Sequence, residues 1–134
     1  MNQNKLRAKS QITFLYFRDL KPASEFLREV MGFDLVDDQG WAKIYRISGN
    51  AYLGIVDEQK GFHKAQEKNA VLITIVVDDV SWWYDYLKSK GVKILKELRE
   101  VEDIGVRCFV LEAPGQYALE VQQFLEPGAI KIFH

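Results

Sequence analysis

Two apolar stretches of the chain have the composition of β-strands, and each is followed by a stretch with helical spacing. The residues from Ile12 to Phe17 and from Val71 to Val77 are rich in β-branched and aromatic side chains, which favours strands. After each stretch, apolar residues recur every three or four positions, which predicts a helix with one buried face. The predicted faces are Leu20, Ala23, Phe26, Leu27 and Val30 in the first helix, and Val80, Trp83, Tyr84 and Leu87 in the second.

The two halves also repeat each other in the residues that begin and end these helices. Asp19 and Asp79 precede the helical stretches, where a carboxylate accepts hydrogen bonds from the free N–H groups of the first turn. Gly32 and Gly91 follow them, where a helix end requires a positive φ. The aspartates are 60 residues apart and the glycines 59, so one structural unit occurs twice.

Three further strand-like segments follow each helix, separated by turns such as Ser48-Gly49-Asn50 and Ala113-Pro114-Gly115. They are 34–36, 41–47 and 51–56 in the first half, and 93–95, 106–111 and 117–124 in the second. The pattern predicts an α+β fold of two tandem βαβββ modules with half-open mixed sheets. We expect a single domain over 1–134, in which module 10–57 and module 70–126 are joined by the polar linker 58–69.

Composition changes this picture little but excludes several classes of partner. The 134 residues are 48% hydrophobic and carry 18 basic and 19 acidic side chains, a formal net charge of -1. A chain of this length buries enough surface to fold without a metal or a disulfide. A balanced charge gives no support to a nucleic-acid partner or an anionic membrane partner. No apolar run approaches the length of a membrane span.

The cysteine content and the N-terminus predict a cytoplasmic protein. Cys108 is the single cysteine, which excludes an internal disulfide and suits a reducing compartment. The segment 1–10 is polar and lacks the apolar stretch of a signal peptide. A lone thiol between Arg107 and Phe109 on a strand is expected to be a packed core residue.

Five segments together resemble the vicinal-oxygen-chelate superfamily, which includes glyoxalases, bleomycin resistance proteins and extradiol dioxygenases. The resemblance covers nearly the whole chain and is one of pattern. The segments are 15–20, 30–33, 76–80, 90–92 and 113–121, the last of which resembles the Asp-Pro-x-Gly-Asn-x-x-Glu hairpin of the family. It differs from that hairpin at Ala113, Gln116 and Tyr117. The resemblance implies that the two modules form a cup, and that such proteins pair as homodimers.

The resemblance also implies four metal-ligand positions, and this sequence fills only one of them with a donor. The positions on the first strands are Ile12 and Leu72, and those on the last strands are Gly54 and Glu120. A metal that activates a substrate needs about three protein donors. His63 and His134 lie outside the strands that face the cup and are expected at the surface. We therefore predict no metal or other cofactor, with Glu120 the only retained candidate ligand.

Strand alternation and the ligand positions predict which residues line the cup. The parity of 41–47 and 106–111 is not fixed by the pattern, but the apolar character of Ile44 suits helix contact and favours Trp41, Lys43 and Tyr45 in the cup. Aromatic residues at this spacing can equally be core residues. Tyr52 is expected to face the same cavity as Glu120. The predicted ligand-binding residues are Phe14, Tyr16, Trp41, Lys43, Tyr52, Thr74 and Gln122.

Glu120 is the predicted catalytic residue if the protein is an enzyme. A carboxylate between Leu119 and Val121 on an apolar strand should reach solvent or meet a cation, with Lys43, Arg46 and Arg107 as candidates. An environment of apolar groups would raise its pKa and suit it to act as a general base.

The sequence leaves three functions open. The first is a metal-free protein of the bleomycin-resistance kind that binds a small aromatic or amphipathic molecule. The second is a glyoxalase-type lyase or isomerase that uses Glu120 as its base, with or without a divalent metal. The third is a structural or regulatory dimer, in which the cup is filled by its own side chains and Trp82 and Tyr86 extend the core or contact another subunit.

Overall fold

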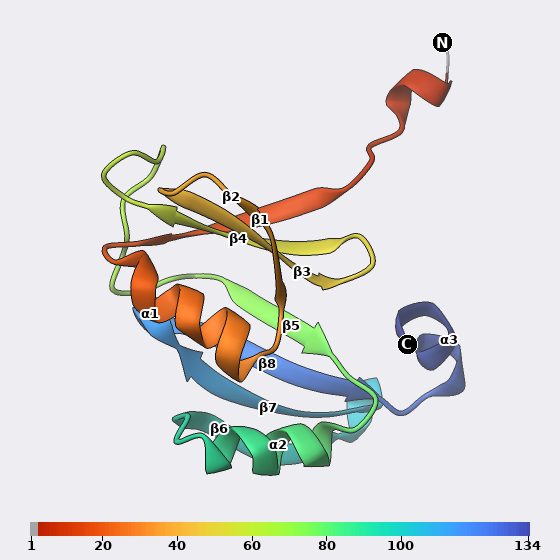
Figure 1. Cartoon of the computed structure of the whole chain (residues 1–134). Coiled ribbons are helices and arrows are strands. Elements are labelled where there is room, and N and C mark those ends of the chain that lie inside the picture. The colour runs from red at the N-terminus through yellow and green to blue at the C-terminus, as the bar shows by residue number, and fades with distance from the viewer. Residues whose placement is uncertain (1–2) are drawn as a thin grey trace. The chain divides into compact units, whose positions relative to one another are not determined.

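The computed structural model describes residues 3–134 and divides the chain into two compact units, Met1–Gln66 and Glu67–His134. Each unit contains one four-stranded mixed sheet and one helix that follows the first strand of that sheet (Figure 1). The predicted fold class is therefore confirmed. None of the helices within the described part of the chain is both long and apolar enough to span a membrane.

The first unit has the strand order β1-β4-β3-β2, in which β1 and β4 are parallel and the other neighbours are antiparallel. A 3-10 turn, Gln3–Leu6, precedes the sheet. The elements that follow are β1 (Gln11–Phe17), α1 (Leu20–Glu25) with a π-helical continuation (Phe26–Val30), β2 (Asp34–Asp38), β3 (Ala42–Ser48) and β4 (Ala51–Asp57).

The second unit repeats this arrangement with the order β5-β8-β7-β6, where β5 and β8 are the parallel pair. Its elements are β5 (Leu72–Val76), α2 (Val80–Ser89), β6 (Ile94–Val101), β7 (Val106–Ala113), β8 (Tyr117–Phe124) and α3 (Pro127–Phe133). Short 3-10 turns at Glu102–Ile104 and Pro114–Gln116 precede β7 and β8.

The predicted helix boundaries are confirmed by the capping contacts. The Asp19 carboxylate accepts from the Lys21 N–H at 3.0 Å, and the Asp79 carboxylate accepts from the Trp82 N–H at 3.1 Å. Gly32 and Gly91 have φ values of 73° and 76°, which residues with a Cβ rarely adopt. The same local chemistry therefore begins and ends the helix of each unit.

Each sheet buries one face beneath its helix. Leu53 and Ile55 of β4 are fully buried, and β4 contacts α1. In the second unit, Leu119 and Val121 of β8 are buried on the face that packs against α2, along with Leu87 of α2 itself. Alternation along each strand leaves the neighbouring residues on the opposite, open face.

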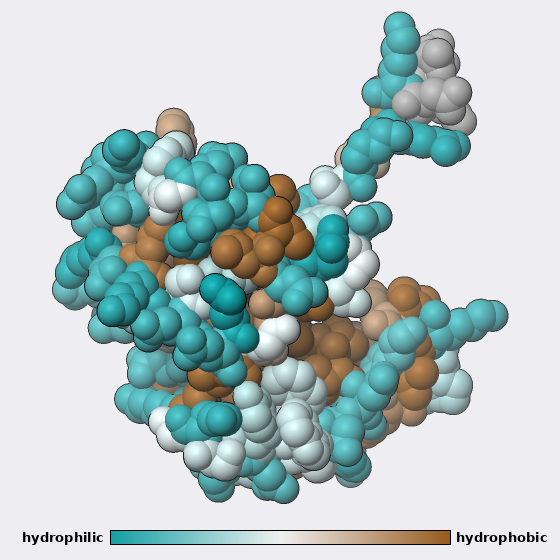
Figure 2. Space-filling view, viewed as in Figure 1, coloured by the Kyte–Doolittle hydropathy of each residue, from teal (hydrophilic) through white to brown (hydrophobic). Residues whose placement is uncertain are grey.

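Two segments differ from the predicted elements. Strand β6 extends to Val101 instead of ending at 95, because it is an edge strand whose register shifts twice against β7 and so hides the alternation. The chain after β8 forms α3, where Ile130, Ile132 and Phe133 are exposed; Figure 2 shows apolar surface in this region.

Candidate functional site

The open face of the first sheet brings together side chains from three adjacent strands. Phe14 of β1 lies opposite Gly54 of β4, and Gly54 lies opposite Ile44 of β3. One step along the same face, Tyr16 lies opposite Val56, which pairs with residue 42. Residues 12, 14 and 16 on β1 and residues 52, 54 and 56 on β4 therefore face the same side of the sheet.

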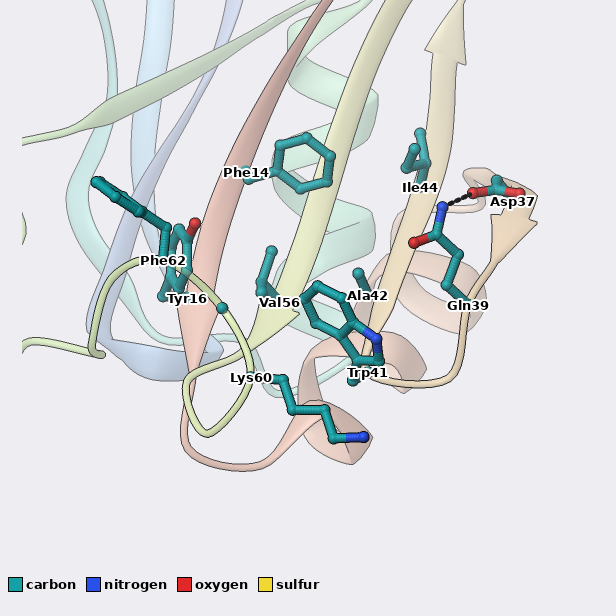
Figure 3. A pocket seen from close by; sticks show the side chains of 11 residues that line it. Phe14, Tyr16, Asp37, Gln39, Trp41, Ala42, Ile44, Val56, Lys60 and Phe62 are labelled. Atoms are coloured by element: carbon teal, nitrogen blue, oxygen red, sulfur yellow. Dashed lines mark hydrogen bonds between the residues drawn. The ribbon is translucent and has the colours of Figure 1, made fainter.

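A cavity of about 260 Å³ lies on this open face. Four aromatic side chains, those of Phe14, Tyr16, Trp41 and Phe62, form its apolar walls (Figure 3). Phe14 and Trp41 keep 40% and 39% of their surface exposed, so a bound molecule can reach them. The remaining lining comes from Asp37, Gln39, Ala42, Ile44, Val56, Lys60 and Gly61.

Two glycines allow the aromatic walls to lie against the backbone. A Cβ at Gly54 would overlap the ring of Phe14, so the ring occupies the space above this residue. A Cβ at Gly61 would come within 2.6 Å of Cε2 of Tyr16 and would also meet Val56. The space left by Gly54 is therefore filled by the ring of Phe14.

The loop after β4 supplies the last wall of the cavity. The carbonyl of Asp57 accepts from the N–H groups of Lys60 and Gly61, which turns the chain back over the sheet. Phe62 is 90% exposed, and its ring meets that of His63 edge to face at 4.6 Å. The His63 ring in turn meets Tyr16 at 5.3 Å, so this exposed histidine contacts a pocket residue.

The predicted orientation of the third strand is wrong for Lys43 and Tyr45. Tyr45 is fully buried on the helix side, where its hydroxyl and that of Ser24 share a hydrogen bond of 2.7 Å. Lys43 lies on that side as well, in register with Ile55, and Ala42 and Ile44 face the cavity instead. Trp41 does line the cavity, but from the turn before β3.

Lys43 has a local electrostatic partner. Its ammonium donates to both carboxylate oxygens of Asp38 at 2.9 Å. This contact, with the Gly40 N–H that also donates to the carboxylate, lowers the pKa of Asp38 from its usual value. Lys43 is therefore paired with Asp38 and lies outside the lining of the cavity.

Tyr52 lies on the open face but outside the cavity lining. Its hydroxyl accepts from Nη2 of Arg46 at 3.1 Å, and the guanidinium carbon lies 5.3 Å from the centre of its ring. Arg46 therefore contacts both the hydroxyl and the ring of Tyr52. Tyr52 belongs to the first unit and Glu120 to the second. That the two share a cavity stays a prediction.

The other predicted site residues lie on the open face of the second sheet. Thr74 of β5 is directly opposite Glu120 of β8, and its hydroxyl donates to Oε1 of Glu120 at 2.9 Å. Gln122 lies two residues further along the same face, opposite Cys108 of β7. The registers therefore settle the parity of 106–111, with Cys108 and Val110 on the open face.

The thiol of Cys108 is buried beside Glu120. Burial, and then the neighbouring Glu120 carboxylate, raise the pKa of this thiol, while Arg99 and Lys96 act in the opposite direction. The thiol is therefore held in its protonated, unreactive form, as expected of a packing residue.

The expected cation partners of Glu120 are engaged elsewhere. Lys43 bonds to Asp38 and Arg46 to Tyr52 within the first unit. Arg107 forms an ion pair with Glu100 of β6. Glu120 instead has a hydroxyl donor, because Thr74 occupies the position opposite it on the parallel neighbour β5.

Sequence reasoning missed several cavity residues, most clearly Asp37, Gln39, Lys60 and Phe62. All four lie at strand ends or in loops, where strand alternation makes no prediction. Phe62 carried the one available signal, since an aromatic residue inside the otherwise polar segment 58–69 has no reason to be there if the segment only links the modules.

The fold and the open sheet faces define a class of protein built from paired βαβββ units. A match to the Glyoxalase/Bleomycin resistance protein/Dioxygenase superfamily covers residues 10–121. The chain therefore belongs to that superfamily, as the sequence resemblance predicted.

Known proteins resemble this chain in sequence or in fold at low sequence identity. The chain is 25% identical over 121 residues to YraH, an uncharacterized protein of Bacillus subtilis strain 168, with 83% of this chain and 94% of that protein covered. A glyoxalase/bleomycin resistance protein/dioxygenase from Nocardioides has a TM-score of 0.73 at 16% identity, with 94% of this chain and 91% of that chain covered. The fosfomycin resistance protein FosX of Listeria monocytogenes has a TM-score of 0.70 at 16% identity, with coverages of 87% and 93%. A lactoylglutathione lyase from Agrobacterium tumefaciens has a TM-score of 0.71 at 20% identity, with coverages of 87% and 94%.

The residues of this chain do not fit the metal that the superfamily implies. Ile12, Leu72 and Gly54 have no side-chain donor, which leaves Glu120 as one carboxylate ligand. Within the described residues, no three or more His, Cys, Asp or Glu side chains are grouped so that they could hold a metal ion. A site that activates a substrate requires about three protein donors, and these four positions supply one.

Proposed function

We propose that this protein binds a small planar aromatic or amphipathic molecule in the cavity on the open face of its first sheet. The observation that supports this most directly is the aromatic lining, formed by Phe14, Tyr16, Trp41 and Phe62 around about 260 Å³. Small-molecule sites are typically apolar concavities with a few polar groups that fix orientation. Flat rings favour a flat ligand, which they contact over a large area at little entropic cost.

The polar groups at the cavity suit an amphipathic ligand. Asp37 and Gln39 come from the end of β2 and the turn after it, and Nε2 of Gln39 donates to the Asp37 carboxylate at 3.0 Å. Lys60 lines the cavity from the loop after β4. A ligand with an apolar body could place its polar end among these three side chains while its rings stack on the aromatic walls.

A thermal-shift screen of planar aromatic compounds against the full chain tests this proposal. We expect hits whose stabilisation is lost in Trp41→Ala, because Trp41 supplies an exposed wall of the cavity. Trp82→Ala is the matched control, since Trp82 is an exposed tryptophan on α2. Equal loss of binding in both variants, or in neither, would place the ligand elsewhere.

We propose that binding needs no metal, since three of the four ligand positions lack donors. Native mass spectrometry of protein purified without chelator or added metal should show the bare chain or a retained organic ligand. About one tightly held metal ion per chain, lost in Glu120→Gln, would contradict this proposal.

A second candidate is a glyoxalase-type lyase or isomerase with Glu120 as general base. The specific observation in its favour is the Thr74 hydrogen bond, which orients the carboxylate as a catalytic base requires. The fold does not decide between the two functions, because its neighbours include both a resistance protein and a lyase. Ligands found in the screen should be incubated in D₂O; proton exchange that is abolished by Glu120→Gln would favour the enzyme.

We also propose that the protein is a cytoplasmic homodimer. Each sheet has two edge strands, β1 and β2 in one and β5 and β6 in the other, and edges favour coverage by another chain. The stacked rings of Trp82 and Tyr86 on α2, 4.9 Å apart, offer an exposed aromatic surface for such a contact. Sedimentation at micromolar concentration should show a dimer, and a monomer would count against the proposal.

A further inference from the structure

Strand β6 places two cations on the open face of the second sheet. Lys96 lies opposite Val110 of β7, and Arg99 lies opposite Cys108. Residues three apart on a regular strand face opposite sides, but the register shift between these two pairs adds one residue to β6. Because Val110 and Cys108 are two apart and share a face, Lys96 and Arg99 share that face as well.

Two carboxylates on this face, those of Glu112 and Glu120, already have partners, and Glu112 lies 3.9 Å from the ammonium of Lys93. Thr74 donates to Oε1 of Glu120 at 2.9 Å, and the Cys108 thiol also interacts with Glu120. Lys96 and Arg99 both act on the same thiol, which places their positive charges near it. The open face therefore has two cations near the Cys108 thiol, while Glu120 accepts a hydrogen bond from a neutral hydroxyl.

Arg99 lacks a hydrogen-bond partner at a buried atom. Its Nη1 is shielded from solvent, and no group in the part of the chain that the structure describes accepts a hydrogen bond from it. An unsatisfied buried donor on a charged group is costly, so such an atom normally has a partner, which can be a protein group, a water molecule or a bound ion. Arg107 is the neighbour of Cys108 on β7 and lies on the opposite face of the sheet. Unlike Arg99, it forms an ion pair with Glu100.

We propose that Arg99 and Lys96 form a binding site for an oxyanion, such as the carboxylate or phosphate group of a small molecule. The planar guanidinium presents N–H donors in a fork that matches two oxygens of such a group, and the Lys96 ammonium adds a second positive charge. The site belongs to the second sheet and does not depend on the cavity of the first unit.

Titration of the ¹⁵N-labelled full chain with inorganic phosphate and with acetate tests the site, with acetamide as the uncharged match for acetate. Saturable shifts of the backbone amides of Lys96, Arg99 and Cys108 are expected with both anions and not with acetamide. Arg99→Gln should weaken binding by about 10- to 100-fold, which is the change expected when a charge-assisted hydrogen bond is lost. Arg107→Gln, which removes an arginine from the opposite face, should leave the affinity unchanged.

Two further variants keep the test decisive. Arg99→Lys retains the charge but not the fork, so it should bind more weakly than the natural chain and more tightly than Arg99→Gln. Glu120→Gln removes a negative charge from the face and should tighten anion binding. Unchanged affinity in Arg99→Gln, an equal loss in Arg107→Gln, or equal shifts with acetamide would overturn the proposal.

Discussion

The ring of Phe14 lies over Gly54, the residue that faces it across the parallel strands β1 and β4. Any larger side chain at residue 54 would overlap this ring. Gly54 occupies a position that the resemblance identifies as a metal-ligand position. In this protein, the ring of Phe14 covers that position instead. The ring of Phe14, placed above Gly54, therefore forms one wall of the cavity.

Gly54→Ala should destabilise the protein by about 1–3 kcal/mol, because the added methyl group forces the Phe14 ring from its place. Urea unfolding measures the change. In the Phe14→Ala background the same substitution should cost much less, since the ring is gone, and the double-mutant cycle gives the coupling. Gly128→Ala is the control, because an added Cβ there meets no neighbour within 4 Å. An equal cost of Gly54→Ala in both backgrounds would contradict the proposed overlap.

Tyr45 should behave as a core residue and not as a ligand contact. Tyr45→Phe removes the hydrogen bond shared with Ser24 and should cost about 0.5–1.5 kcal/mol, while Tyr45→Ala should cost about 3–5 kcal/mol. Lys43→Ala, which breaks a surface ion pair, should cost at most about 1 kcal/mol. Denaturant unfolding of the three variants measures these effects. A Tyr45→Ala variant as stable as Lys43→Ala would contradict the burial of Tyr45 on the helix side of the sheet.

His134 should anchor helix α3 to the end of β8. Its Nε2 accepts from the Phe124 N–H at 3.3 Å, which leaves the ring proton on Nδ1 to be donated to Asp78 at 2.8 Å. The ring of Phe133 also stacks on Phe124, with centroids 4.7 Å apart. His134→Ala should speed amide hydrogen exchange at Phe124 and along α3 by about fivefold, as expected for a loss of about 1 kcal/mol. His63→Ala should leave the exchange of the Phe124 amide unchanged, and a similar acceleration in that variant would refute the anchor.

The Cys108 thiol should make the protein less stable at alkaline pH. Burial raises its pKa above the usual value of 9.0, so between the two pKa values the folded state holds a proton that the unfolded state has released. Stability from this group is full below the unfolded pKa and is lost as the pH rises through the folded pKa. The free energy of unfolding of the natural chain should therefore fall relative to that of Cys108→Ala between about pH 7 and about pH 10. A difference between the two proteins that does not change with pH would show that the folded state does not raise this pKa.

The sequence by itself determined the elements and their repetition, because the signals for these are local. Asp19 and Asp79 accept hydrogen bonds from N–H groups only two or three residues away, and Gly32 and Gly91 supply a positive φ at their own positions. The faces of β1, β4, β5 and β8 also followed, because strand alternation divides each strand into two faces and the ligand positions implied by the resemblance indicate which face is open. These features were enough to identify the fold and its superfamily.

The tertiary structure alone decided which residues meet at each open face. Strand β3 has apolar side chains on both faces, as Ile44 and Tyr45 show, so its sequence contained no signal to choose the side that packs on α1. The register shifts of β6, which bring Arg99 and Lys96 to one face, depend on pairing with β7. The approach of Phe62 to the cavity likewise depends on how the loop after β4 turns back over the sheet. Each of these is a contact between residues distant along the chain, and such contacts form only when the sheet and the loop are assembled.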